Sequence, residues 1–165
     1  MRWNTGGSVN TTSYRELESF LVDGVVTDRA LQDAIRMSGW STEELRFGLN
    51  KVYAVDLAGV SQFLYSDAGE AFLQDQTRSY VPFWRQKMTA AMALRAAIIA
   101  DAKDGLLSSI GIMKQLPVSF RLPDNGPTDG RQNVCAPDKV SGDQATSLLS
   151  WYVFLPACIK ANSER

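Results

Sequence analysis

Histidine is absent from this chain of 165 residues, and its absence limits the chemistry that the side chains can perform. Imidazole exchanges a proton readily near neutral pH, and the Ser–His–Asp and Cys–His arrangements of hydrolases depend on it. The G-x-S-x-G pattern of a hydrolase nucleophile is also missing from the sequence. The nearest fragment begins at Gly59, and Phe63 stands where the closing glycine belongs. The sequence therefore predicts a protein that is not an enzyme and has no catalytic residues.

Only two cysteines are present, Cys135 and Cys158, and they lie 23 positions apart. Common zinc sites use histidine or clustered cysteine, so we expect neither a metal nor a cofactor. One interpretation of the pair is a disulfide, which would contribute roughly 3 kcal/mol by restricting the unfolded chain. Such a bond is typical of an oxidising compartment. The other interpretation is two unrelated thiols, one in a loop and one buried, and both interpretations remain open.

Arg95 falls at nearly the same helical angle as an apolar stripe, between Ala91 and Ile98. It could bind an anion, such as a carboxylate or a lipid head group. Alternatively, it could be a structural residue that pairs with a carboxylate such as Glu70 and lays its aliphatic part over apolar neighbours. A charge that faces a core is normally paired, which favours the structural interpretation.

Other side chains that could take part in chemistry have spacings better explained by structure. Six carboxylates fit helix capping and solvated helix faces better than acid–base catalysis: Glu16, Glu18, Glu43, Glu44, Asp101 and Asp104. Three aromatic residues could line a ligand groove, but core packing explains them better: Tyr80, Phe83 and Trp84.

The charge pattern excludes some partners. The 17 basic and 18 acidic side chains are mixed along the chain and give a net charge of −1. We therefore expect no nucleic-acid partner, because that function needs a basic patch or stripe. No apolar run approaches the roughly 18 residues that a membrane-spanning helix needs. The chain is therefore predicted not to span a membrane.

The elements that must position these residues are mostly helices around one long central helix. The stretch from Pro82 to about Lys103 is rich in helix formers, and its length predicts a helix of roughly 33 Å. Its apolar stripe comprises Trp84, Met88, Ala91, Ile98 and Ala102, with Leu94 and Ile99 beside it. Helix starts are predicted from capping residues at Ser13, Thr27, Ser41, Asp56 and Ser66. Helix ends or breaks are predicted at Gly24, Gly39 and Gly105.

The predicted fold class is all-α: a compact multi-helix domain with a long central helix and a loop-rich C-terminal tail. Residues 1–12 are interpreted as a flexible lead-in, 13–122 as the helical domain, and 123–165 as a Pro/Gly-rich loop with an apolar C-terminal segment. Residues 51–55 are expected to form a short β-leaning link. A helix bearing Leu106, Leu107, Ile110 and Met113 is expected after Gly105, and 118–122 is expected to be a lone extended segment.

The apolar run from Leu148 to Ile159 is the other feature of the tail. Trp151 and Tyr152 each combine a large apolar body with a polar tip, which is typical of interfaces. The run either folds back to complete the core or docks on a partner protein. The sequence favours folding back, and Trp151 and Tyr152 are kept as candidate binding residues.

Three segments carry a resemblance to a known family: SYRELESFLVDGVVTDRALQDAI, FLYSDAGEAFL and ALRAAIIADAKDGLLSSIGIMKQLPVSFRL. In order and spacing, they resemble the helical N-terminal region of cyanobacterial proteins labelled alpha/beta hydrolases of unknown function. The resemblance covers about Ser13 to Leu122. In that family a hydrolase part usually follows the helical region, and here none of that size follows. None of the family's catalytic residues can be assigned to a position in this chain.

The function expected from this combination is a non-catalytic helical module that binds another protein or serves as an accessory subunit. The resemblance implies a cyanobacterial envelope or thylakoid complex, with a membrane-protein complex among the partners considered. The alternative is a small lipid- or pigment-binding carrier with a groove between helices. The expected location is the thylakoid lumen or periplasm, or the cytoplasm if Met1 is the native start, because the first residues form no signal peptide.

Overall fold

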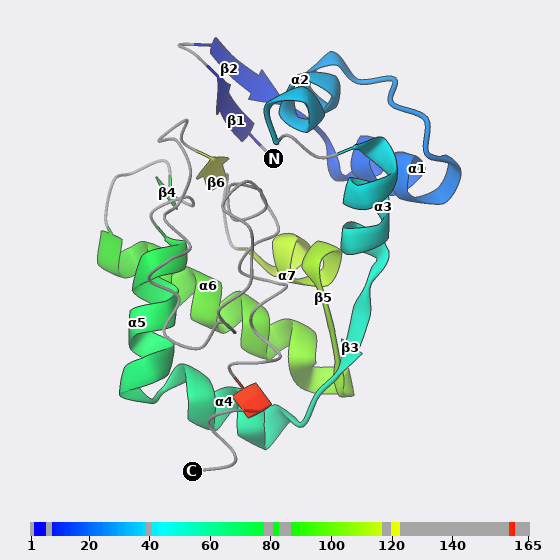
Figure 1. The fold of residues 1–165 in the computed structure, drawn as a ribbon. Helices are drawn as coiled ribbons and strands as arrows, with labels where there is room; N and C mark the ends of the chain where they lie inside the picture. The colour runs from blue at the N-terminus through cyan, green and yellow to red at the C-terminus, as the bar shows by residue number, and fades with distance from the viewer. Residues whose placement is uncertain are drawn as a thin grey trace.

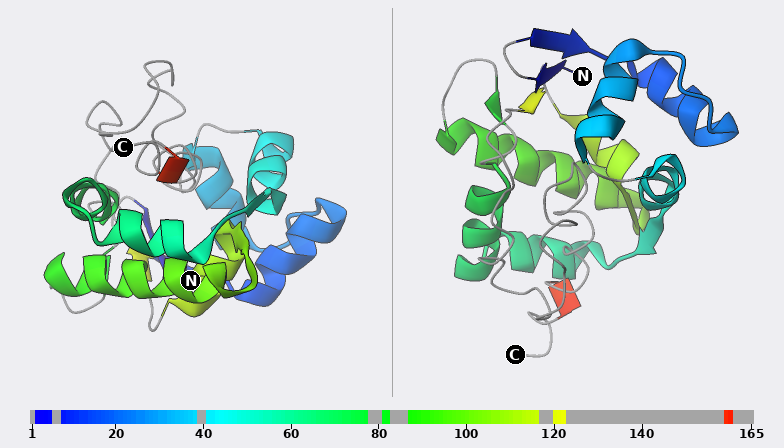
Figure 2. Two further views of the ribbon diagram at one scale, coloured as in Figure 1. Left: turned by 90° about the horizontal axis from the view of Figure 1, so that it is seen from below. Right: turned by 45° about the horizontal axis from the view of Figure 1, so that its top comes forward.

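Seven α-helices make up most of the chain that the structure describes, together with one 3₁₀ turn and six short strands (Figure 1). The structure is a computed structural model. It describes residues 2–5, 8–38, 41–77, 81–82, 87–116, 120–122 and 159–160. The expectation of a compact, mostly helical domain is confirmed. Figure 2 shows α4 and α6 side by side, with α1 to α3 grouped at the opposite side of the molecule.

The first three helices form a cluster with its own core. They are α1 (Tyr14–Asp23), α2 (Arg29–Ser38) and α3 (Thr42–Asn50). Their buried side chains, with two from α7, are Leu17, Phe20, Ala30, Leu31, Ile35, Leu45, Leu49, Ile110 and Met113. Ser13 caps α1 by accepting a hydrogen bond from the Glu16 amide, and Gly24 ends that helix with a φ of 77°. Both of these local predictions are confirmed.

The cap of α2 differs from the prediction. The Asp28 carboxylate accepts hydrogen bonds from the amides of Ala30 (3.3 Å) and Leu31 (3.1 Å), which makes Asp28 the capping residue. The predicted cap, Thr27, donates its hydroxyl to Glu16 instead, at 2.8 Å. Asp28 also accepts a hydrogen bond from the buried Thr12 hydroxyl, at 2.7 Å. Thr27 and Asp28 can both cap a helix, and the contact with Thr12 favours Asp28 in that role.

The other four helices enclose the larger core. They are α4 (Leu57–Leu64), α5 (Asp67–Gln76), α6 (Lys87–Asp101) and α7 (Ser109–Gln115). The predicted caps Asp56 and Ser66 are confirmed, since they accept from the amides of Gly59 and Gly69. The largest of the fully buried side chains in this core are Phe63, Leu64, Phe72, Leu73, Leu94, Ile98 and Leu107.

The central helix is shorter than predicted. It begins at Lys87 and ends at Asp101, so its 15 residues span about 22 Å instead of about 33 Å. Val81 and Pro82 form β4, which pairs antiparallel with β6. Because β4 is an edge strand, the missing N–H of Pro82 is tolerated there. Trp84 lies outside the described residues, whereas Leu94 and Ile98 are buried as predicted.

A four-stranded sheet in the order β2-β1-β6-β4 was not expected. β1 (Arg2–Thr5) and β2 (Ser8–Thr11) form an antiparallel hairpin within the segment predicted as a flexible lead-in. β6 (Phe120–Leu122) runs parallel to β1 and antiparallel to β4, so the extended segment is not alone. The structure differs from both predictions because β1 pairs with β6, with Arg2 opposite Arg121, and this contact between distant segments places the β1–β2 hairpin and β6 in one sheet.

A second sheet joins the two helical groups. β3 (Val52–Ala54) pairs antiparallel with β5 (Leu106–Ser108), and this confirms the β-leaning link but corrects the helix expected to include Leu106. Leu107 is 1% exposed and Leu106 is 51% exposed, which is the alternation of a strand. Gly105, with a φ of 76°, makes the turn into β5, and α7 begins only at Ser109.

Within the apolar run from Leu148 to Ile159, the structure describes Ile159. It is partly buried and packs against the larger core, close to Gly59 of α4. Figure 1 shows this short segment beside α4. The remainder of the run, with Trp151, Tyr152, Cys135 and Cys158, lies outside the described residues.

Gly69 and Gly59 provide a matched pair of substitutions. A Cβ at Gly69 would lie 2.7 Å from the Phe63 carbonyl carbon and 2.8 Å from the Leu64 Cα, and these backbone atoms cannot move aside cheaply. Gly69→Ala should therefore lower the free energy of unfolding by about 1–3 kcal/mol or more. A Cβ at Gly59 would meet Asp56 at an ordinary 3.4 Å, so Gly59→Ala should stabilise by about 0.5–1 kcal/mol. Urea denaturation measures both, and equal effects would contradict the packing of α4 on α5.

Candidate functional site

Arg95 connects α6 to the turn between α4 and α5. Its Nε donates to the Leu64 carbonyl at 3.0 Å, and its guanidinium pairs with Glu70, the carboxylate named above as a structural partner. Its guanidinium carbon lies 4.7 Å from the centre of the Tyr65 ring, a stacked cation–π arrangement. Only 16% of the Arg95 side chain is exposed. These contacts hold the guanidinium in one orientation.

Two exposed apolar side chains belong to the same region as Arg95, Tyr65 through its ring contact and Met92 through its position on α6. Tyr65 is 69% exposed, and Met92, one turn before Arg95 on α6, is 63% exposed. We call Tyr65, Met92 and Arg95 the Tyr65 surface. Tyrosine, methionine and arginine are enriched at protein interfaces, and tyrosine and arginine often dominate their binding energy. The arrangement is thus suited to contact with another macromolecule.

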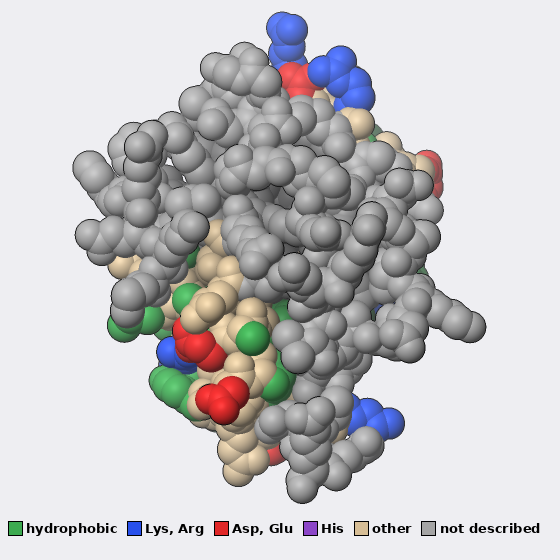
Figure 3. Space-filling model, turned by 60° about the vertical axis from the view of Figure 1, so that its left-hand side comes forward, with side chains coloured by type: hydrophobic (Ala, Val, Ile, Leu, Met, Phe, Trp, Pro, Cys, Tyr) green, Lys and Arg blue, Asp and Glu red, His purple; other side chains and the backbone are tan. Residues whose placement is uncertain are grey.

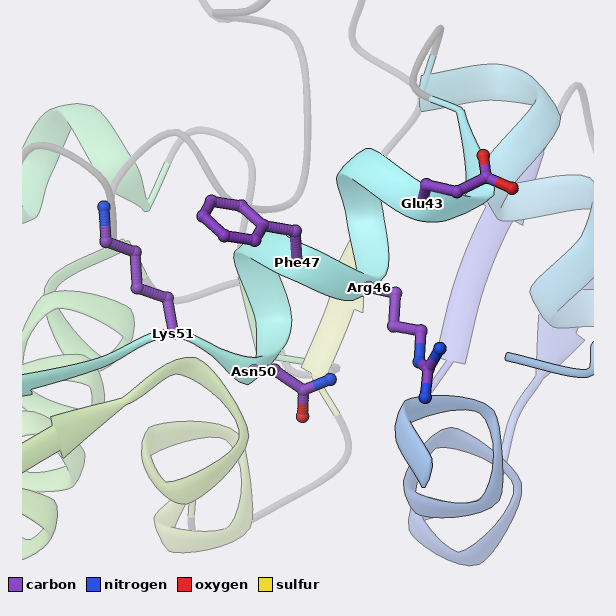
Figure 4. A pocket seen from close by; sticks show the side chains of 5 residues that line it. All are labelled: Glu43, Arg46, Phe47, Asn50 and Lys51. Atoms are coloured by element: carbon purple, nitrogen blue, oxygen red, sulfur yellow. The ribbon is translucent and has the colours of Figure 1, made fainter. Parts of the chain in front are cut away.

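A pocket of about 380 Å³ lies on the outer face of α3, lined by Glu43, Arg46, Phe47, Asn50 and Lys51 (Figure 4). In Figure 4, Arg46 and Asn50 point toward α1, and Phe47 and Lys51 extend on the other side of the helix. Glu43 lies near the first turn of α3. The pocket is therefore an open groove along one helix, with apolar and charged groups on its rims.

Arg46 and Asn50 are held by the end of α1. Arg46 Nε donates to the Leu21 carbonyl at 2.8 Å, and its Nη2 donates to the Val22 carbonyl. Asn50 Nδ2 also donates to Leu21, at 3.2 Å. The last carbonyls of a helix lack partners within the helix and carry its negative dipole end, so a guanidinium is favourable there. These two polar groups consequently fix α3 against α1.

Lys51 lies near two aromatic rings. Its ammonium is 5.9 Å from the centre of the Phe47 ring and 5.1 Å from that of Tyr53. Phe47 itself is 72% exposed. An ammonium within about 6 Å of a ring face is attracted by it, so the position of Lys51 is partly determined by these rings.

The carboxylates singled out from the sequence have structural contacts where they are described. Glu16 accepts the Thr27 hydroxyl, and Glu18 pairs with Lys114. Asp101 accepts the Ser108 amide at 2.8 Å, and Ser108 in turn caps α7 by accepting the Gly111 amide at 2.9 Å. Asp101 thus joins the end of α6 to the start of α7.

Two ionisable groups in the described core have shifted pKa values. Burial raises the pKa of the Asp101 carboxyl, the hydrogen bond from Ser108 lowers it, and the nearby Asp104 carboxylate raises it. Burial also raises the pKa of the Tyr14 phenol, which donates a hydrogen bond to the Met113 carbonyl. Neither group lines the α3 pocket or belongs to the Tyr65 surface.

The structure places one of the sequence candidates and adds others. Arg95 is in the described part of the chain, whereas Trp151, Tyr152, Cys135 and Cys158 are outside it. Sequence reasoning did not single out Tyr65, Met92, Phe47 or Lys51 as binding residues. The 72% exposure of Phe47 depends on which elements pack around it in space, which its sequence pattern does not show. The spacing of four residues between Glu43, Phe47 and Lys51 was available as a signal.

The described residues contain no candidate metal site and no candidate membrane span. Within them, no group of three or more acidic or cysteine side chains is placed to hold a metal ion. No helix among them combines the length and hydrophobicity needed to cross a bilayer. Figure 3 shows one face of the molecule, where acidic, basic and hydrophobic side chains of the described residues are mixed.

Comparisons with known proteins relate this chain to a described family. A family model described as "Alpha/beta hydrolase of unknown function (DUF1400)" matches residues 4–120. No curated protein and no solved structure matches the chain. The matched range includes α1 to α7, and therefore both the Tyr65 surface and the α3 pocket.

The raised pKa of Asp101 has a consequence for stability. The Asp101 carboxyl keeps its proton to a higher pH in the folded state than in the unfolded state. Ionisation of Asp101 therefore opposes folding. Its contribution to the free energy of unfolding should fall as pH rises from about 3.9, the ordinary value, through the folded pKa. Asp101→Asn cannot ionise, so the wild type should lose stability relative to this variant across that window. Urea denaturation at a series of pH values measures the difference.

Asp104→Asn is the matched control, because it removes the neighbouring charge that raises the pKa of Asp101. In that variant, the pH range over which ionisation of Asp101 lowers stability should be narrower, because the pKa of Asp101 is then raised less. A stability difference between wild type and Asp101→Asn that does not change with pH, or that grows in favour of the wild type as pH rises, would contradict the assignment.

Proposed function

This chain belongs to the family described as alpha/beta hydrolases of unknown function, and we propose that it is a non-catalytic helical module of that family that binds another protein. An alpha/beta hydrolase holds its nucleophile at a sharp strand-to-helix turn, on the G-x-S-x-G pattern, above a sheet. The described strands are only two to four residues long. Of the residues in the matched range 4–120 that the structure describes, most are helical. The sequence contains neither that pattern nor histidine. These features support an accessory role rather than hydrolysis.

The Tyr65 surface is the observation on which the proposal depends. A side chain that must be ordered on binding loses conformational entropy, and this loss reduces affinity. Arg95 has already lost that freedom, because Leu64, Glu70 and Tyr65 hold it in place. Met92 adds an exposed, adaptable apolar contact beside it. A partner protein can therefore gain apolar contact and a hydrogen-bonding guanidinium at little ordering cost.

The proposed partner is an alpha/beta-hydrolase catalytic unit, the class of protein that the family description names. The proposed setting is the one implied by the resemblance: a cyanobacterial envelope or thylakoid complex, in the thylakoid lumen or periplasm. In this arrangement the helical module supplies contact and placement, and the partner supplies the reaction.

The lipid- or pigment-carrier function has weaker support. A carrier needs an apolar cavity between helices that encloses most of its ligand. The pocket lined by Glu43, Arg46, Phe47, Asn50 and Lys51 is on the outer face of α3 and includes three charged side chains. Phe63, Leu64, Phe72, Leu94 and Ile98 are at most 1% exposed and fill the space between α4, α5 and α6.

Site-specific crosslinking tests the proposal. A photo-reactive benzoylphenylalanine replaces Tyr65 in the full chain, expressed in its own organism, and adducts are identified by mass spectrometry. We expect one major adduct, with a protein that contains an alpha/beta-hydrolase unit. The matched control replaces Val22, which is 79% exposed at the end of α1, and should give no such adduct. Met92→Glu should reduce the adduct at position 65 by about tenfold, because it places an unpaired charge in the contact.

Equal adducts from positions 65 and 22 would show that the Tyr65 surface has no special role. The absence of any adduct at position 65, with the protein folded and expressed, would contradict the proposal.

The purified chain should not hydrolyse esters, since it lacks the histidine and nucleophile pattern of a serine hydrolase. Release of p-nitrophenol from a p-nitrophenyl ester is the measurement, with a reaction lacking protein as the reference. Turnover above that reference that a serine-directed reagent abolishes would overturn the non-catalytic assignment.

A further inference from the structure

The α3 pocket contains an ordered row of side chains distinct from the Tyr65 surface. Glu43 lies four residues before Phe47, and Lys51 lies four residues after it, so the acidic and basic groups flank the aromatic ring evenly. All three side chains are exposed, Phe47 to 72%. Figure 4 shows Glu43 near the start of α3, Lys51 just beyond its end and Phe47 between them. We name these three residues the α3 ridge.

We propose that the α3 ridge binds the α3 ridge of a second copy of this chain, with the two helices antiparallel. A two-fold axis through the Phe47 position brings the two Phe47 rings together. It also places Glu43 of each copy opposite Lys51 of the other. A two-fold interface requires a surface that is complementary to itself, and a charge order of acidic–apolar–basic meets that requirement only in the antiparallel direction.

The packing geometry agrees with this arrangement. Residues spaced by four form a ridge on a helix surface, and two such ridges interdigitate at the commonest helix-crossing angle in globular proteins, near −50°. Along α3 the rise from Glu43 to Phe47 is about 6 Å, and Lys51 directly follows the last residue of the helix, so an acidic and a basic group lie on opposite sides of the ring and both charge pairs can form around the central rings. A pair of aromatic rings adds stabilisation beyond the apolar area that it buries.

The ridge is held in place before binding. Arg46 and Asn50, on the adjacent face of α3, bond the carbonyls of Leu21 and Val22 and so fix the helix on α1. The Lys51 ammonium is already near the Phe47 ring. Little conformational freedom is therefore lost when a second copy docks, and this favours association.

The size of the contact predicts a weak dimer. A stable interface buries about 800 Å² on each partner, and one helix of nine residues with the adjoining Val52, which is 53% exposed, presents less than that. We expect dissociation in the micromolar range or above, and a loss of affinity at high salt, because the charge pairs are exposed.

Charge reversal tests the proposal in the full-length protein. Sedimentation velocity over a series of concentrations should show a monomer–dimer equilibrium for the wild type. Glu43→Lys alone gives a ridge with two positive ends and should weaken self-association by about tenfold or more. Lys51→Glu alone gives a ridge with two negative ends and should weaken self-association to a similar extent. A mixture of the two variants should dimerise again, because each positive end then meets a negative one. The double variant, Glu43→Lys with Lys51→Glu, should self-associate like the wild type.

Phe47→Ala should also weaken the dimer, because it removes the central rings without placing a charge in the contact. Because the substituted side chains are exposed, each variant should melt within a few degrees of the wild type, as measured by circular dichroism. A wild-type protein that stays monomeric up to about 1 mM would overturn the proposal. A dimer insensitive to both single reversals, or a mixture that fails to restore association, would overturn it as well. None of these variants alters the Tyr65 surface.

Discussion

The packing of α6 against α4, α5 and α7 organises the larger core. Leu94 and Ile98 of this helix are completely buried, and each contributes roughly 1.5–3 kcal/mol by leaving water. Four further positions in the same helix and the 3₁₀ turn after it are buried alanines: Ala90, Ala91, Ala97 and Ala102. Their small side chains let α4, α5 and α7 approach closely. Rotation of α6 would expose the leucine and isoleucine and drive larger residues into these contacts, so its orientation is strongly determined.

Both candidate surfaces follow from fixed helices and local polar contacts. The orientation of α6 places Arg95 at the edge of the core, where it bonds Leu64 and Glu70 and stacks on Tyr65. The orientation of α3 is determined by its buried Leu45 and Leu49 together with Arg46, which bonds the carbonyl end of α1. In each case a partly buried arginine bonds groups within the molecule, and apolar side chains close to it in the sequence or in space are exposed.

The two proposals assign these surfaces different partners for a physical reason. The Tyr65 surface combines a guanidinium with tyrosine and methionine, and it has no internal symmetry that would suit a second copy. The α3 ridge has an acidic group on one side of Phe47 and a basic group on the other. A second copy in the antiparallel direction therefore complements it. The two proposals are compatible, because the two surfaces share no residue.

Local sequence patterns were enough to predict the helical class, the burial of Leu94 and Ile98, and the helix caps and ends at Ser13, Gly24, Asp56, Ser66 and Gly105. These depend on neighbours within a few residues, so periodicity and capping chemistry suffice to find them. Three features depended on the tertiary structure: the pairing of residues 2–5 with residues 8–11, the strand at Pro82, and the strand β5 before α7. A strand is stabilised by a partner that can lie a hundred residues away, as β6 does for β1, and no local pattern specifies which one. The exposure of Tyr65 and Phe47 depends in the same way on which helices pack around them.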